Sequence, residues 1–211
     1  VPELDHVSCK VQRGEILAVA GVQGNGQSEL AEVILGLRTP DSGTITLEGK
    51  DITCANPRKS LNSGVGFVPE DRMTDGMVSS FSIADNLVLD QFNAPEFAWG
   101  PSRKLGAVAR NARAKQEEYD IRLTSINDPI SSLSGGNQQK VVVAREMSRE
   151  LKLLVVNQPT RGVDVGSIEF IHRRIVEVRD QGCAVLLISS ELDEVVALAD
   201  RIAVMYRGRI V

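Results

Sequence analysis

The sequence has 211 residues, of which 42% are hydrophobic, and carries a formal net charge of −4 and three cysteines. This length suits one globular domain with a full core, while a run of about 20 apolar residues, the length needed to cross a bilayer, is missing. The acidic balance argues against binding to a nucleic-acid backbone, and the cysteine spacing indicates neither a disulfide framework nor a zinc site. We expect a piece of a longer chain, because it begins with Val1 and stops inside a hairpin-like pattern.

The first thirty-odd residues predict a strand, a glycine-rich loop and a helix. Ile16–Ala20 is an unbroken apolar run, as in a strand covered on both faces. Glycine-rich residues 21–28 follow, and apolar residues then recur at helical spacing from Leu30 to Leu37. This is the order of elements in which a phosphate-binding loop occurs.

The rest of the chain predicts an α/β fold. Residues 44–51 read as an antiparallel hairpin beside the main sheet, and further buried strands are expected at 65–69, 153–156, 184–188 and 202–206. Helical patterns cover 82–89, 108–119, 141–151 and 168–178, with an irregular stretch at 93–101. Alternating strands and helices predict a mainly parallel core sheet. We expect a core of about 1–78 and 151–211, an antiparallel side sheet, and a helical subdomain at about 79–150.

The glycine loop has the G-x-x-x-x-G-K-[ST] frame except for its lysine. In such a loop backbone N–H groups surround phosphates, the lysine reaches the β- and γ-phosphates, and the hydroxyl binds Mg²⁺. Here the lysine position is Gln27, which has no charge, and losing a charge-assisted hydrogen bond of roughly 1.5–3 kcal/mol weakens binding about ten- to a hundred-fold. The alternative is a turn that only joins strand to helix. The frame residues are Gly21, Gly24, Asn25, Gly26, Gln27 and Ser28.

Two amides, Asn157 and Gln158, follow the strand at 153–156. A phosphate-hydrolysing enzyme would place there one acid to hold Mg²⁺ and another to activate water. Losing a general base lowers the rate by roughly 10²–10⁴. The alternative is an ordinary strand end capped by amides.

Two longer strings resemble motifs of the ATP-binding cassette (ABC) ATPases. Leu133–Lys140 is similar to their signature motif, and Gln158–Gly166 to their Walker B to D-loop segment. The resemblance covers essentially the whole chain, in order. Asn137 and the Pro69–Arg72 string are most similar to the second, C-terminal cassette of tandem ATPases that drive simple-sugar and nucleoside importers, and Ile168–His172 resembles the nucleoside branch.

The resemblance implies roles for individual residues. The signature residues Ser134, Gly135 and Gly136 would meet the γ-phosphate of ATP held by the opposite cassette, and Asp164 would be the D-loop acid. Glu70 falls at the Q-loop position and departs from its glutamine, and Ser190 stands where the family commonly has histidine. ATP would be held by the frame of Gly21, Gly24, Asn25, Gly26, Gln27 and Ser28, with weak or absent Mg²⁺ at Ser28.

These observations lead to one hypothesis with two alternatives. The chain's own ATP site is expected to be degenerate at Gln27, Glu70, Asn157, Gln158 and Ser190, giving negligible ATPase activity alone, while its signature serves ATP on the first cassette of the same polypeptide. The resemblance implies transmembrane permease subunits as partners, an extracytoplasmic substrate-binding protein indirectly, no nucleic acid, and a location at the cytoplasmic face of the membrane. The alternatives are a self-sufficient P-loop ATPase that tolerates Gln27, and a soluble ABC protein acting on nucleic acid or the ribosome, which the acidic charge disfavours.

Overall fold

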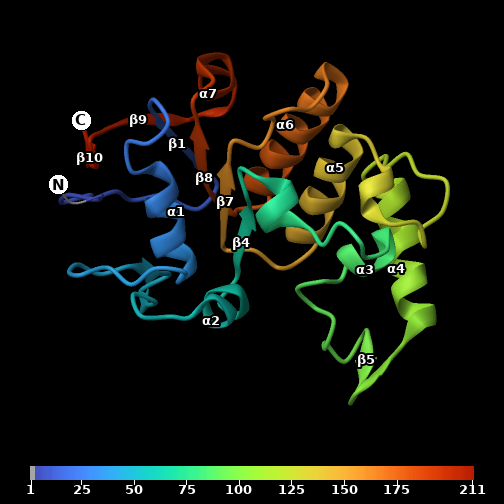
Figure 1. Ribbon diagram of the computed structural model, residues 1–211. Coiled ribbons are helices and arrows are strands. Elements are labelled where there is room, and N and C mark those ends of the chain that lie inside the picture. Colours follow the sequence, from blue (N-terminus) through green and yellow to red (C-terminus); the bar gives the residue numbers. More distant parts are fainter. Residues whose placement is uncertain (1–2) are drawn as a thin grey trace. The chain divides into compact units, whose positions relative to one another are not determined.

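The computed structural model describes residues 3–211 (Figure 1). The chain forms two compact units: the first contains Val1–Val68, Arg149–Pro159 and His172–Val211, and the second contains Pro69–Ser148 and Thr160–Ile171. The subdomain limits expected from the sequence stay a prediction. No helix among the described residues is both long enough and apolar enough to pass through a membrane.

A six-stranded sheet in the order β10-β9-β1-β8-β7-β4 organises the first unit (Figure 1). Every neighbouring pair is parallel except β9 and β10. The mainly parallel sheet expected from the sequence is therefore confirmed. The strands are β1 (Ile16–Ala20), β4 (Val65–Val68), β7 (Leu153–Asn157), β8 (Ala184–Ser189), β9 (Arg201–Tyr206) and β10 (Arg209–Ile210).

The register brings the carboxyl ends of three strands together. Ala20 at the end of β1 pairs with Ser189 at the end of β8, and Asn157 at the end of β7 pairs with Ile188. The loops that leave these three strands therefore start at one edge of the sheet, where ligands of parallel α/β sheets usually bind.

Helices cover this sheet because its strands are apolar on both faces. Ile16, Ala18 and Val19 are fully buried, as are Leu154 and Val185. Helix α1 (Gln27–Leu35) packs on β7, and α7 (Leu192–Leu198) packs on β1 and β8. The short helix α2 (Pro57–Asn62), which the sequence reading did not predict, packs on α1 and β4.

A separate antiparallel pair in the first unit confirms the predicted side hairpin. Strands β2 (Thr46–Leu47) and β3 (Lys50–Asp51) pair across the turn Glu48-Gly49. Both turn residues have positive φ, 49° and 77°, as the tight turn of a two-residue hairpin requires.

The second unit is mainly helical. It contains the π-helix η1 (Arg72–Gly76), α3 (Ile83–Asn86), α4 (Leu105–Glu118), the 3₁₀ helix η2 (Ile130–Ser132) and α5 (Gly135–Glu146) (Figure 1). Helix α6 (Val165–Asp180) begins in this unit and ends in the other. The π-helix was not predicted.

Two sequence-based expectations for the second unit were wrong in detail. The helix expected at 82–89 spans only Ile83–Asn86, and the region expected to be irregular contains a hairpin of β5 (Ala98–Trp99) and β6 (Ser102–Arg103). Beyond Asn86 the backbone bonds shorten to three-residue spacing: the Val88 N–H donates to the Asp85 carbonyl oxygen, and the Leu89 N–H donates to that of Asn86.

Candidate functional site

The glycine loop leaves β1 and enters α1 in the first unit. Gly24 and Gly26 have φ of 86° and 109°, in the left-handed region that favours glycine. Close packing also demands glycine: a Cβ at Gly21 would lie 2.5 Å from the Met205 carbonyl oxygen, and one at Gly26 would lie 2.8 Å from the Glu3 carbonyl oxygen. Backbone conformation and close packing therefore require glycine at these positions between β1 and α1.

The Gln27 side chain folds back into this loop. Its Oε1 accepts a hydrogen bond from the Asn25 backbone N–H at 3.0 Å, and its Nε2 donates to the Val22 carbonyl oxygen at 3.1 Å. The residue is only 6% exposed. A phosphate-binding loop directs its backbone N–H groups at the anion, whereas here one of them is used by the chain itself. The Asn25 N–H becomes available to a phosphate only if the Gln27 amide is displaced.

Asn25 fixes the same loop to the C-terminal hairpin. Its Oδ1 accepts from the Arg207 N–H and its carbonyl oxygen accepts from the Gly208 N–H, both at 2.8 Å. Its Nδ2 donates to the Val22 carbonyl oxygen at 2.7 Å. The loop conformation is thus supported by bonds within the chain. Ser28, in the first turn of α1, is half-buried.

Of the two amides at the end of β7, Gln158 is hydrogen-bonded to Ser190, just beyond β8. Gln158 has a φ of 50°, a left-handed conformation uncommon outside glycine. Its Nε2 donates to Ser190 Oγ at 3.1 Å, and its Oε1 accepts from the Ser190 N–H at 3.3 Å. Asn157 is 5% exposed. At the positions where acids were expected, the side chains are neutral, and one of them bonds to the residue that replaces the expected histidine.

In the second unit, the residues that resemble the signature motif form the start of helix α5. Ser134 is the N-cap residue, and α5 runs from Gly135 to Glu146. In the described chain the Ser134 side chain makes no capping bond to the first turn. Its Oγ instead accepts from Nδ2 of Asn137 at 3.0 Å. Ser134 is exposed, so its hydroxyl lies at the surface of this unit.

Asp164, which the resemblance places in a D-loop, lies against this helix start. Its carboxylate accepts from the Ser167 N–H at 3.0 Å and from Ser167 Oγ at 2.8 Å, which holds the pKa of Asp164 below its ordinary value. A Cβ at Gly136 would lie 2.4 Å from Asp164 Oδ2, and a Cβ at Gly135 would lie 2.6 Å from Arg72 Nη2. The two signature glycines therefore permit close approach of the neighbouring loops.

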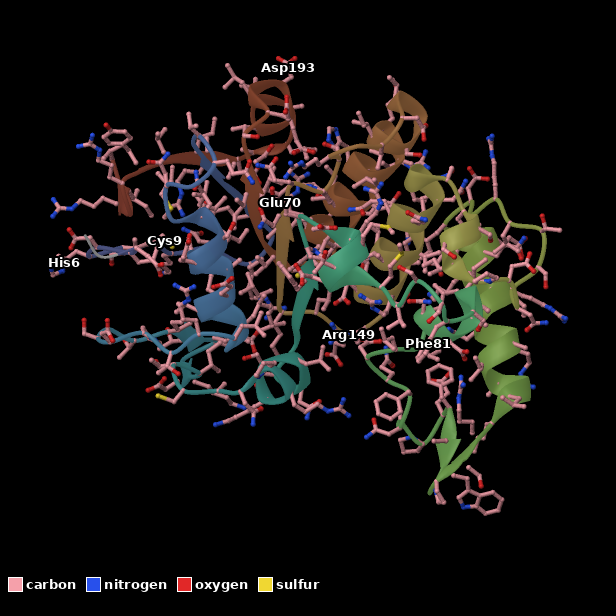
Figure 2. The ribbon with its side chains drawn as sticks, viewed as in Figure 1. His6, Cys9, Glu70, Phe81, Arg149 and Asp193 are labelled. Carbon is pink, nitrogen blue, oxygen red and sulfur yellow. The ribbon has the colours of Figure 1, made fainter. Side chains whose placement is uncertain are left out.

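The loop after β4 bonds to the D-loop segment. Glu70, which lies just beyond β4 (Figure 2), forms an ion pair with Arg161. Arg72 Nη1 donates to the Arg161 carbonyl oxygen at 3.1 Å, and Arg72 Nε donates to Oε1 of Gln138, on α5, at 3.4 Å. Arg72 is half-buried, and its guanidinium group donates to carbonyl and amide oxygens of its own unit. Glu70 is thus an ion-pair partner of the D-loop.

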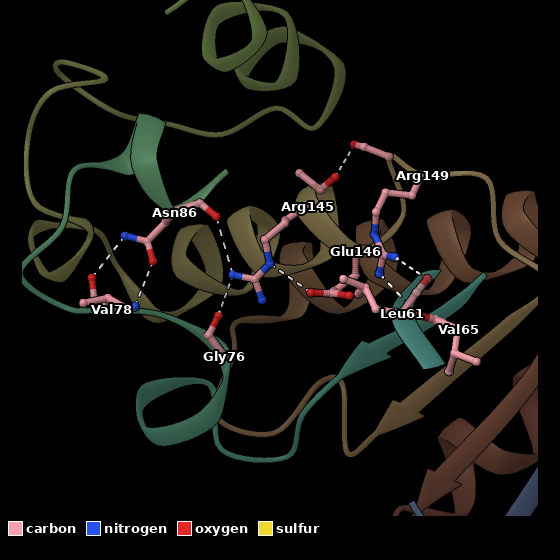
Figure 3. Close-up of polar contacts among 10 residues, drawn as sticks. Leu61, Val65, Gly76, Val78, Asn86, Arg145, Glu146 and Arg149 are labelled. Carbon is pink, nitrogen blue, oxygen red and sulfur yellow. Dashed lines mark hydrogen bonds and ion pairs between the residues drawn. The ribbon is translucent and has the colours of Figure 1, made fainter. Parts of the chain in front are cut away.

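A buried charged pair at the other end of α5 was not foreseen. Arg145 and Glu146 are each 6% exposed, and Arg145 Nε donates to Glu146 Oε1 at 2.9 Å. Arg145 Nη1 also donates to the Gly76 carbonyl oxygen at 2.8 Å (Figure 3). Arg145 therefore ties α5 to the ends of the π-helix and of α3. Nothing in the sequence pattern distinguishes it from other arginines of a helix.

Comparisons with known proteins agree with this geometry. Residues 4–161 match the family described as "ABC transporter". The chain is 49% identical over 206 residues to the "Guanosine import ATP-binding protein NupO" of Bacillus subtilis (strain 168), which covers 97% of this chain and 40% of the relative. It is 42% identical over 212 residues to the "Ribose import ATP-binding protein RbsA 2" of Rubrobacter xylanophilus, which covers 99% of the chain and 40% of the relative. The chain thus spans about two fifths of the curated relatives it matches.

Solved structures give the same result for the fold. A nucleotide-free ATP-binding cassette from an ABC transporter superposes with a TM-score of 0.82 at 27% identity, covering 99% of this chain and 83% of that one. The ADP conformation of the ABC transporter cassette MJ1267 superposes with a TM-score of 0.78 at 25% identity, again covering 99% and 83%. The expected cassette fold is confirmed.

Proposed function

The chain belongs to the ABC transporter family, and from this premise we propose that it is an importer's nucleotide-binding domain whose own ATP site is degenerate and whose signature serves ATP on a partner cassette. An ABC cassette binds ATP, with Mg²⁺ as its usual companion, so the proposal concerns which half of the machinery this chain supplies. The transported class would be nucleosides or simple sugars, as the names of the guanosine and ribose import relatives suggest.

One observation carries the proposal, namely the Gln27 amide folded into its own glycine loop. This amide uses the Asn25 N–H and supplies no positive charge. The hydrogen bonds between Gln158 and Ser190 also support a degenerate site. Both side chains are neutral, and they occupy the positions where hydrolysis would need a general base and an imidazole. ATP would bind weakly at this loop, and any ATP bound there would be hydrolysed slowly.

The signature, in contrast, keeps the groups that a phosphate requires. Ser134 offers an exposed hydroxyl, and α5 offers the N–H groups of its first turn with the positive end of its dipole. These groups could stabilise charge on a γ-phosphate held by another cassette. More than half of each matched relative lies outside the matched region, which leaves room for a first cassette in the same polypeptide.

The remaining partners follow from the importer assignment. Transmembrane permease subunits would hold the chain at the cytoplasmic face of the membrane, and an extracytoplasmic substrate-binding protein would act through them. The Glu70–Arg161 ion pair would let the loop after β4 follow the D-loop during the cycle. Nucleic acid is not among the proposed partners.

Two measurements test this function. The 211-residue chain should show negligible steady-state ATPase activity, and turnover at ordinary ABC rates that is abolished by Ser28→Ala would favour a self-sufficient ATPase instead. In the full-length protein with its permease, Ser134→Arg should stop hydrolysis and transport. Unchanged activity of that variant would show that the signature is not used by a partner site.

A further inference from the structure

The signature hydroxyl of Ser134 is oriented by one neighbouring side chain. Asn137 Nδ2 donates to Ser134 Oγ at 3.0 Å, and Asn137 Oδ1 accepts from the backbone N–H of Arg122 at 2.8 Å. A backbone N–H can only donate, so the oxygen of the amide must face Arg122. The NH₂ group of Asn137 therefore faces Ser134, and the opposite orientation of the amide would place two donors against each other.

This arrangement determines what the hydroxyl can do. A serine hydroxyl has one hydrogen to donate and two lone pairs that accept. With Asn137 donating into one lone pair, the hydroxyl hydrogen points away from Asn137 and is left for an acceptor outside the helix. An N-cap serine ordinarily turns its oxygen to the N–H groups of the first helical turn, but Ser134 makes no such bond in the described chain.

We propose that Asn137 is a positioning residue that keeps the Ser134 hydroxyl as a hydrogen-bond donor directed at the γ-phosphate on the partner cassette. The inference rests on the proposed function, because it requires the signature to face that phosphate. A phosphate oxygen only accepts, so a hydroxyl that donated its hydrogen to a neighbour in its own chain would contribute less. Asn137 does not take this hydrogen, because its NH₂ group donates to the Ser134 oxygen and offers it no acceptor.

The isosteric change Asn137→Asp tests the orientation directly in the full-length protein assembled with its permease. One carboxylate oxygen still accepts from the Arg122 N–H, and the other becomes an acceptor that draws the Ser134 hydrogen inward. Loss of one hydrogen bond to a charged group is expected to lower kcat about ten- to a hundred-fold. The KM for ATP should change little, since the nucleotide is held by the other cassette.

The added negative charge of N137D would also repel phosphate, so the variant is measured again in a Ser134→Ala background. Repulsion persists without the hydroxyl, whereas the orientation effect disappears. If the proposal holds, the fold-decrease in kcat caused by N137D is several-fold smaller in the Ser134→Ala background than in the otherwise unchanged protein. An equal loss in both backgrounds, or a kcat for N137D equal to that of the unchanged protein, would overturn it.

Asn137→Ala provides a second reading if the aspartate variant does not fold. It removes the donor without adding charge, so kcat should fall, and the fall should again depend on the presence of the Ser134 hydroxyl. No dependence on that hydroxyl would overturn the proposal. The result for Ser134→Arg separates the two hypotheses. If this variant abolishes hydrolysis while the Asn137 variants act independently of Ser134, only the positioning role fails. If Ser134→Arg has no effect, the proposed function fails.

Discussion

Replacing Gln27 with lysine should turn the glycine loop into a much stronger nucleotide-binding loop. The present side chain binds the Asn25 N–H at 3.0 Å and the Val22 carbonyl oxygen at 3.1 Å, and so closes the loop on itself. Lysine offers three donors and no acceptor, so it cannot bind the Asn25 N–H. The change therefore releases one N–H for a phosphate and adds a positive charge beside it.

The size of the effect can be estimated from these two contributions. A net neutral hydrogen bond is worth about 0.5–1.5 kcal/mol, so releasing the Asn25 N–H should strengthen phosphate binding about two- to ten-fold. A charge-assisted bond from lysine adds about 1.5–3 kcal/mol, a further ten- to hundred-fold. Because adjacent contributions are rarely additive, we expect ATP to bind at least about ten-fold more tightly to the Gln27→Lys chain.

Titration of the 211-residue chain with ATP, with and without Mg²⁺, measures this effect. Gln27→Met keeps a side chain of similar length without an amide, so it should show only the smaller gain. Gln23→Lys adds the same charge at an exposed position of the loop and controls for general attraction. If Gln27→Lys binds ATP no more tightly than Gln23→Lys, the inward amide is not what limits nucleotide binding.

Two further predictions concern stability. Arg145→Leu should lower the free energy of unfolding by about 3–5 kcal/mol in urea titrations, because the buried Glu146 carboxylate loses its arginine and the Gly76 carbonyl loses its donor. Adding Glu146→Leu should recover part of this loss. A decrease near zero for the single change would contradict the importance of the pair. Asp164 has a lowered pKa in the folded chain, so its contribution to stability is present above its unfolded pKa of about 3.9 and is lost as the pH falls through the folded pKa. Thermal unfolding followed between pH 6 and pH 2 should therefore show a weaker acid dependence for Asp164→Asn, and identical curves would refute this role.

Short-range patterns in the sequence were sufficient for the framework of the fold. The apolar run Ile16–Ala20 and the helical spacing after Ser28 predicted β1, the glycine loop and α1, because strand and helix periodicities are local properties. The alternation of strands and helices predicted a mainly parallel sheet for the same reason. Failures occurred where local preference is weak, as in the four-residue α3 and the β5–β6 hairpin.

The sequence by itself also determined which functional groups are present: a string at Ser134 that resembles the signature, and neutral side chains at Gln27 and Gln158. Only the tertiary structure decided where these groups point. The inward Gln27 amide depends on the path of the loop, Gln158 reaches Ser190 across 32 positions of sequence, and Asn137 is oriented by the N–H of Arg122 fifteen residues away. The contacts of Gln158 and Asn137 form between segments that meet only after folding, so residue type fixes their chemistry while chain topology fixes their partners.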